Sequence, residues 1–136
     1  MEQYQILMQL YGEDKQDLYL SRMMRYYIRK DDLRQVLQYK EYFFPRKKAL
    51  DSKDLTELSG YLFDKRYGKL SQSEEPLRIL IEDVRTLLER AVKADMNNPV
   101  AIYNFGRYFV ETANYPSALN LLTNAKDIFE AQEVRN

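Results

Sequence analysis

The sequence contains neither cysteine nor histidine. Without cysteine the chain can form no disulfide framework and no cysteine-ligated zinc site. Without histidine it lacks the side chain that most often serves in acid–base catalysis and in metal binding. The sequence also has no phosphate-binding glycine loop and no nucleophile–base pattern. We therefore expect a protein that is not an enzyme and that needs no metal and no cofactor.

An excess of one charge and long apolar runs are also absent. The 21 basic residues equal the 21 acidic residues in number, so the overall charge gives no argument for binding nucleic acid. No segment approaches the roughly 18 consecutive apolar residues of a membrane-spanning helix. The first residues lack the basic start and the apolar stretch of a signal peptide. We expect no membrane segment, and a cytoplasmic location if this is the full-length chain.

Glycine and proline are scarce, with four of each, and this scarcity permits long helices. The 136 residues are enough for one domain with a sizeable core. A content of 45% apolar and 31% charged residues is typical of a globular chain. The sequence predicts a single all-α domain over residues 1–136.

The clearest helical pattern lies in residues 99–125. A first helix is expected from Pro99 to Thr112, capped by Asn97 or Asn98, and a second from about Pro116 to Ala131. The apolar faces consist of Ile102, Phe105 and Phe109 in the first helix and of Ala118, Leu121, Leu122, Ala125 and Phe129 in the second. This pattern predicts a tight helix–turn–helix hairpin in which the small Gly106 lies opposite the alanines.

Two weaker copies of the hairpin precede this one. Residues 52–98 carry helices over about 52–67 and 76–94, with Ser59 or Gly60 as the small residue and an insertion near residues 67–76. Residues 17–50 form a degenerate copy. Its turn lies at residues 30–32, Asp31 or Asp32 caps its second helix, and Pro45 ends that helix. Asp51 or Ser52 is expected to cap the next helix, and residues 1–12 predict one more short helix.

The three hairpins resemble the tetratricopeptide repeat family. The matching residues are Ile102, Phe105, Gly106, Phe109, Ala118, Leu122 and Ala125 in the last hairpin, Leu55, Leu58, Ser59, Leu62, Val84, Leu88 and Ala91 in the middle one, and Leu20, Met23, Met24, Tyr27, Leu33 and Val36 in the first. The sequence departs from the family pattern at Met24, where the family has a small residue, and at Glu130, where the family usually has proline. The resemblance implies a right-handed α-solenoid of about three stacked helix–turn–helix hairpins, over residues 17–50, 52–98 and 99–132.

The resemblance also implies a binding surface, because proteins of this family bind peptides in a groove lined by the first helix of each hairpin. Six residues carried over by register are the candidate partner-binding site: Arg25, Thr56, Phe63, Tyr103, Asn104 and Arg107. Ser21, Ile28, Gly60 and Val110 fall in the same register. The expected function is that of a protein–protein interaction or scaffold module that binds a peptide or partner protein. The alternative for Arg25 and Arg107 is that they are ordinary solvated helix charges.

Tyrosine and basic residues cluster in the first hairpin. Among the 12 tyrosines, Tyr27 and Tyr103 lie near core register and are expected to fill space between helices, whereas Tyr26 and Tyr42 suit either packing or an interface. Residues 20–48 contain nine basic and three acidic residues. This basic stripe suits a solvated face, an acidic protein partner or, less well given the zero net charge, nucleic acid.

A structural role is the other alternative. The last predicted helix carries Phe129 and Val134, and no separate polar capping helix follows them in the sequence. Terminal repeats normally need a polar outer face for solubility. The chain could therefore stack on further repeats, or on copies of itself as a homo-oligomer.

Overall fold

The structure is a computed structural model that describes residues 13–68 and 79–135, and these residues form helices and no strands. The helices are α2 (Glu13–Arg29), α3 (Leu33–Phe43), α4 (Ser52–Tyr67), α5 (Ile81–Ala94), α6 (Pro99–Glu111) and α7 (Tyr115–Arg135). The predicted all-α class is confirmed. The helix predicted over residues 1–12 and most of the insertion predicted near 67–76 lie outside the described residues.

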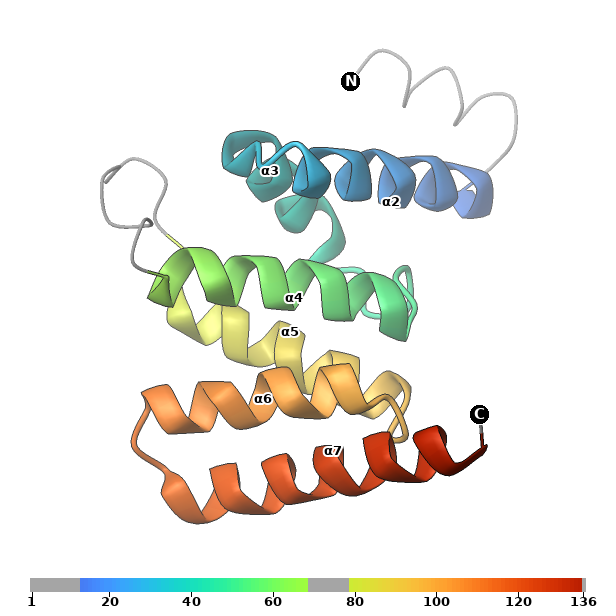
Figure 1. The fold of residues 1–136 in the computed structure, drawn as a ribbon. Helices are drawn as coiled ribbons and strands as arrows, with labels where there is room; N and C mark the ends of the chain where they lie inside the picture. Colours follow the sequence, from blue (N-terminus) through green and yellow to red (C-terminus); the bar gives the residue numbers. More distant parts are fainter. Residues whose placement is uncertain (1–12, 69–78, 136) are drawn as a thin grey trace.

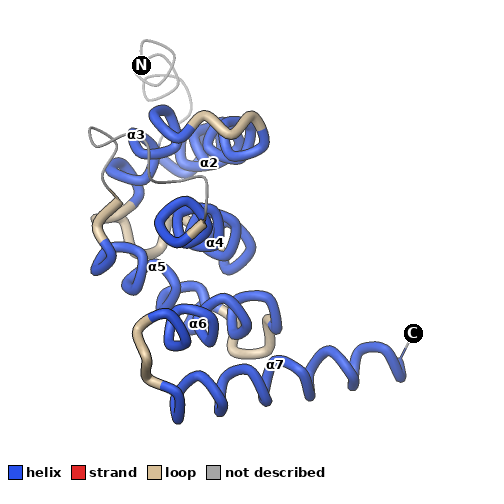
Figure 2. Tube along the Cα trace, turned by 60° about the vertical axis from the view of Figure 1, so that its left-hand side comes forward, coloured by secondary structure: helices blue, strands red, loops and turns tan. Residues whose placement is uncertain are grey.

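The helices pack in consecutive pairs, α2 with α3, α4 with α5 and α6 with α7, and the pairs are stacked (Figure 1). The first helices also pack on one another, because α4 contacts both α2 and α6. Seen from the side of the stack, α3 and α5 both lie to the left of α4 (Figure 2). We call the row α2, α4 and α6 the first-helix layer.

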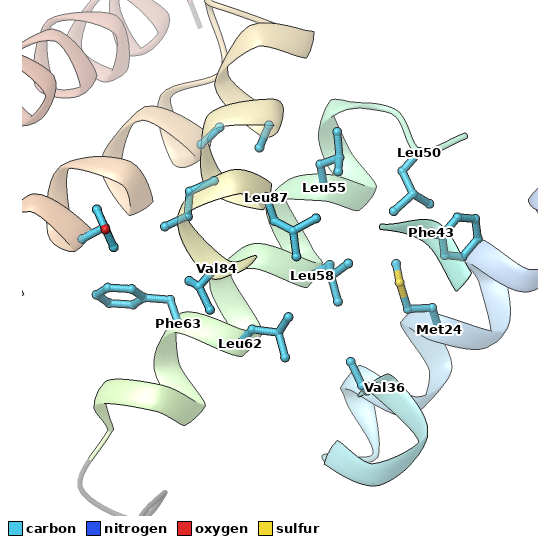
Figure 3. Close-up of a cluster of buried hydrophobic side chains, with 14 of the residues drawn as sticks. Met24, Val36, Phe43, Leu50, Leu55, Leu58, Leu62, Phe63, Val84 and Leu87 are labelled. Carbon is cyan, nitrogen blue, oxygen red and sulfur yellow. The ribbon is translucent and has the colours of Figure 1, made fainter. Parts of the chain in front are cut away.

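The core lies around α4. Leu58 and Leu62 of α4 are fully buried between Val84 and Leu87 of α5 and Met24 of α2, as Figure 3 shows. Phe43 of α3 extends the same cluster toward the first pair. The apolar periodicity of four different helices therefore converges on one contiguous core.

Three of the predicted helix caps are confirmed. The side chain of Asp32 accepts a hydrogen bond from the Gln35 backbone at the start of α3, and Asp51 accepts one from Asp54 at the start of α4. Asn98 accepts two, from the backbone N–H groups of Val100 and Ala101, at the start of α6. Each cap satisfies N–H groups that lack a partner within the helix.

The predicted start of α5 is wrong. The helix begins at Ile81 rather than at Pro76, and Ile79 and Leu80 are not helical. Glu82 and Asp83 consequently lie in the first turn, where negative charge is favoured by the helix dipole.

The tight crossing at Gly106 is confirmed, but its expected neighbours are not. A Cβ atom at Gly106 would lie 2.8 Å from Leu122 Cδ2, 2.9 Å from Leu122 Cγ and 3.4 Å from Leu121 Cβ. The three nearest atoms therefore belong to leucines and not to the expected alanines. Ala118 and Ala125 are also buried.

The turns of the first and last pairs share one geometry that the sequence did not reveal. Asp31 and Ala113 both have positive φ, at 55° and 61°. In each turn two backbone N–H groups donate hydrogen bonds to carbonyls of the preceding helix. In the first pair Asp31 donates to Ile28 and Asp32 to Tyr27. In the last pair Ala113 donates to Val110 and Asn114 to Phe109. This is the Schellman pattern, which glycine usually occupies at the left-handed position.

Replacement of Gly106 by valine should lower the free energy of unfolding by about 1–3 kcal/mol, because the added atoms must displace Leu122 or separate α6 from α7. Urea denaturation followed by far-UV circular dichroism measures the change. The matched control is Ala131→Val on an exposed part of α7, which should cost only a few tenths of a kcal/mol. Equal losses in the two variants would contradict the close crossing.

Replacement of Ala113 by glycine should raise the free energy of unfolding by about 0.5–1 kcal/mol. A left-handed conformation costs a residue with a Cβ roughly 1–2 kcal/mol, and glycine escapes this penalty at a smaller entropic cost. The control is the same substitution at exposed Ala131 inside α7, which should lower stability by about 1 kcal/mol. Opposite signs at the two sites are the expected result, and a loss at both would argue against the left-handed turn.

Candidate interaction surface

Polar contacts join the helices of the first-helix layer. Arg25 of α2 pairs with Asp54 of α4 at 3.3 Å, and Arg107 of α6 pairs with Asp64 of α4 at 3.0 Å. Asn104 of α6 approaches α4 so closely that a Cβ at Gly60 would lie 2.9 Å from its amide nitrogen. These contacts fix the spacing of α2, α4 and α6.

Arg107 is the most constrained charged residue of this layer. Its terminal nitrogens donate to Asp64 Oδ1 at 3.0 Å and to Asn104 Oδ1 at 2.8 Å. Its guanidinium lies 4.8 Å from the ring centre of Phe63 and 5.2 Å from that of Tyr103. Two aromatic rings and two acceptors therefore hold the guanidinium in one place, with a third of the side chain still exposed to solvent.

The six predicted site residues differ in how much surface they offer. Thr56, Phe63 and Asn104 are buried, as are Ser21 and Gly60 of the same register. Arg25 and Arg107 are partly buried in ion pairs. Tyr103 and Val110 are 40% and 42% exposed. Tyr103 was expected to fill space between helices, and this expectation is wrong because its ring lies at the surface beside Arg107.

Thr56 belongs to a partly buried polar junction between the middle and last pairs. Its hydroxyl donates to the Ser52 carbonyl at 2.6 Å and accepts from the Asn98 amide at 3.2 Å. The same amide donates to the Ser52 hydroxyl, which in turn donates to the carbonyl of Ala91. Thr56 thus has a structural contact that connects α4, α5 and the start of α6.

Sequence reasoning missed part of the exposed side of the layer. On α2 the burial of Leu20 and Met24 turns Leu18, Arg22 and Tyr26 outward, on the opposite side of the helix. These three residues are spaced four apart in the sequence, and this helical spacing was the signal that could have identified them as one exposed side. The exposed side chains that we call the first-helix face are Leu18, Arg22 and Tyr26 of α2, Lys53 and Asp64 of α4, and Val100, Tyr103, Arg107 and Val110 of α6.

The basic stripe of residues 20–48 is not one continuous free surface. Lys40 is buried between α3 and α5, where it forms ion pairs with Asp83 and with Glu41. Burial acts to lower the pKa of Lys40, but its hydrogen bonds to the two carboxylates outweigh burial and raise the pKa. Arg25 is paired with Asp54, and Arg46 lies over the ring of Tyr42 at 4.4 Å.

The other tyrosines of the first hairpin have different surroundings. Tyr27 stacks on Tyr39 and packs against the core, as predicted. Tyr42 donates to Asp17 at 2.8 Å, whereas Tyr26 is 49% exposed. An open pocket of about 490 Å³ lies beside Asp17 and the loop after α3, lined also by Arg46, Lys47 and Lys48.

No group of three or more acidic, histidine or cysteine side chains within residues 13–68 and 79–135 is placed to hold a metal ion. Over the same part of the chain, none of the helices has the length and apolar character needed to cross a membrane. Comparison with known proteins finds no family model, no curated protein and no solved structure that matches the chain.

The burial of Asp54 predicts a pH effect. Burial raises the pKa of the Asp54 carboxyl, and Asp51 raises it further, while Arg25 acts to lower it. The folded protein therefore holds this proton more tightly than the unfolded chain does. As pH rises from the ordinary aspartate value of 3.8 through the raised folded-state value, Asp54 makes the protein progressively less stable.

Asp54→Asn removes this titration. The stability of the variant relative to the wild type should therefore increase between about pH 3 and pH 6, while other carboxyl groups cancel in the difference. Urea denaturation of both proteins across this range measures it. A difference that stays constant with pH, or that changes in the opposite direction, would show that Asp54 is not held in a desolvated position.

Proposed function

We propose that the chain is a right-handed α-solenoid of tetratricopeptide-like hairpins and that it serves as a non-enzymatic protein–protein interaction module. The serial packing of α2, α4 and α6, and the shared turn geometry of the first and last pairs, support the repeat architecture. The partner is a peptide or protein segment that lies along the first-helix face.

The observation that carries the proposal is the arrangement of Tyr103 and Arg107 on α6. A guanidinium already held by Phe63, Asp64 and Asn104 loses little freedom when a partner binds. Arginine has five N–H donors. These neighbours use two of them, one on each terminal nitrogen, and the Nε–H is buried without an acceptor among the described residues. The second N–H of each terminal nitrogen can donate to a carbonyl or carboxylate of the partner.

Apolar anchoring comes from the same helices. Large exposed apolar side chains on the described helices lie on α2, α6 and α7, whereas α4 contributes charged groups to the first-helix face. Leu18 and Tyr26 on one side of α4, and Val100, Tyr103 and Val110 on the other, flank this charged strip. A peptide that crosses the layer would meet apolar contacts at its ends and polar contacts in the middle. Tyrosine and arginine are frequent energetic centres of such interfaces.

A peptide selection tests the proposal without assuming any particular partner sequence. Peptides are selected by phage display on the immobilised wild-type protein, synthesised, and titrated by isothermal calorimetry. Tyr103→Ala and Arg107→Ala should each weaken binding by about tenfold or more, which is the effect of truncating an interface centre.

The matched control is Tyr115→Ala, because Tyr115 is a more exposed tyrosine and lies on α7 rather than on the first-helix face. This variant should bind the same peptides with unchanged affinity. The proposal is overturned if selected peptides bind all three variants as tightly as the wild type, or if their binding is lost only in Tyr115→Ala.

A further inference from the structure

Helix α7 lies at the far edge of the stack in both views (Figures 1 and 2). Its extensive packing is with α6. Four of the large exposed apolar side chains belong to it, namely Tyr115, Leu119, Phe129 and Val134. The first-helix face does not include this helix, so any contact made by α7 is separate from the proposed peptide site.

Comparison of α7 with α5 shows which flank of α7 is incompletely covered. The two helices align with Val84 at Ala118 and Ala91 at Ala125, and all four of these residues are buried. Between them, Leu87 and Leu88 of α5 are fully buried, and α5 packs on both α4 and α6. The corresponding Leu121 and Leu122 of α7 are only partly buried. The flank that α6 covers on α5 is therefore open on α7.

The residues along this open flank have the spacing of a helix–helix seam. Tyr115, Leu119, Leu122, Lys126 and Phe129 follow one another at alternating intervals of four and three residues, which is the pattern of coiled-coil contact positions. Leu122 lies at the border of the flank, because it also covers Gly106 of α6 and is partly buried there. Tyr115 and Leu119 are 63% and 67% exposed. We call these five residues the α7 seam.

The order of side chains makes the seam complementary to its own reverse. Read forward, its first four members run aromatic, leucine, leucine, cation, and these four pair with one another in the reversed copy, whereas Phe129 lies beyond the paired stretch. When a second copy lies antiparallel, Leu119 meets Leu122 of the second copy and Lys126 meets the ring of Tyr115 of the second copy. The same chain already places Arg107 over Tyr103 and Arg46 over Tyr42.

Charge selects this direction. A parallel pair would place Lys126 beside Lys126 of the second copy, where like charges repel. Within the described part of the chain, Lys126 pairs with Glu130 at 3.8 Å, and this long, exposed pairing contributes little and is easily exchanged. A two-fold antiparallel pair also uses the same patch on both copies, as symmetric dimers do. We propose that α7 forms an antiparallel homodimer through the α7 seam.

Sedimentation equilibrium of the full chain from about 5 μM to 1 mM tests the proposal, across the range in which interfaces of modest area associate. The wild type should change reversibly from monomer to dimer. Leu119→Glu should raise the dissociation constant by about a hundredfold or more, because two charges enter one apolar seam by symmetry. Leu119 is exposed, so unchanged circular dichroism should show that the variant remains folded.

Val134→Glu is the matched control, because Val134 is also on α7, is more exposed than Leu119 and lies outside the seam. It should dimerise like the wild type. A wild-type protein that stays monomeric up to about 1 mM, or a dimer that persists in Leu119→Glu, overturns the proposal. Peptide binding at the first-helix face should be unchanged in Leu119→Glu, so failure of one proposal can be distinguished from failure of the other.

The absence of cysteine allows a direct test of direction. A spin label on Glu130→Cys reports the distance between the two copies of this exposed position in the dimer. In the antiparallel register the two labels should lie about 28 Å apart along the helix axis, from a rise of about 1.5 Å per residue. Labels that are level with each other would indicate a parallel pair and would overturn the proposed seam.

Discussion

The structure depends on the burial of α4, which packs against α2, α5 and α6 at once. Buried residues follow one another along it with few interruptions, and they include polar residues such as Asp54, Thr56 and Ser59 as well as leucines. A helix with neighbours on three sides cannot have one apolar stripe and one polar face. Both α2 of the first pair and α6 of the last pair pack on this helix, so its position determines how the exposed surfaces of the first-helix layer are arranged.

Polar groups accompany the apolar core at each junction of the stack. Asp54 meets Arg25 between α2 and α4, and Lys40 meets Asp83 between α3 and α5. Asn98 connects the start of α6 to Ser52 and Thr56 of α4. Groups of this kind are costly to bury without partners, and a shifted register of the helices would leave them unpaired. They therefore favour one arrangement of the hairpins over others with similar apolar contacts.

The two proposed interaction surfaces use different physical means. The first-helix face presents Arg107 in a fixed position, where aromatic rings and acceptors have already restricted its motion. The α7 seam presents apolar side chains on a flank that the neighbouring helix covers in the middle pair but not in the last one. The first surface suits an extended partner that needs directional hydrogen bonds. The second suits a helix, because its contact positions repeat along one line. Each copy in the proposed dimer then keeps its first-helix face available for a partner of its own.

The amino-acid sequence alone was enough to establish the all-α class, the bounds of α4, the caps at Asp32, Asp51 and Asn98, and the close crossing at Gly106. These features depend on residues near one another in the chain, where periodicity and capping chemistry act directly.

The exposed side of each helix, in contrast, was settled by tertiary packing. Thr56 and Phe63 were placed on a surface by a register that assumes one buried stripe, and the neighbours of α4 bury both. Tyr103 was assigned to the space between helices, yet its ring lies outside, against Arg107. Which side of a helix is exposed depends on how many neighbours it has, and those neighbours come from distant parts of the chain.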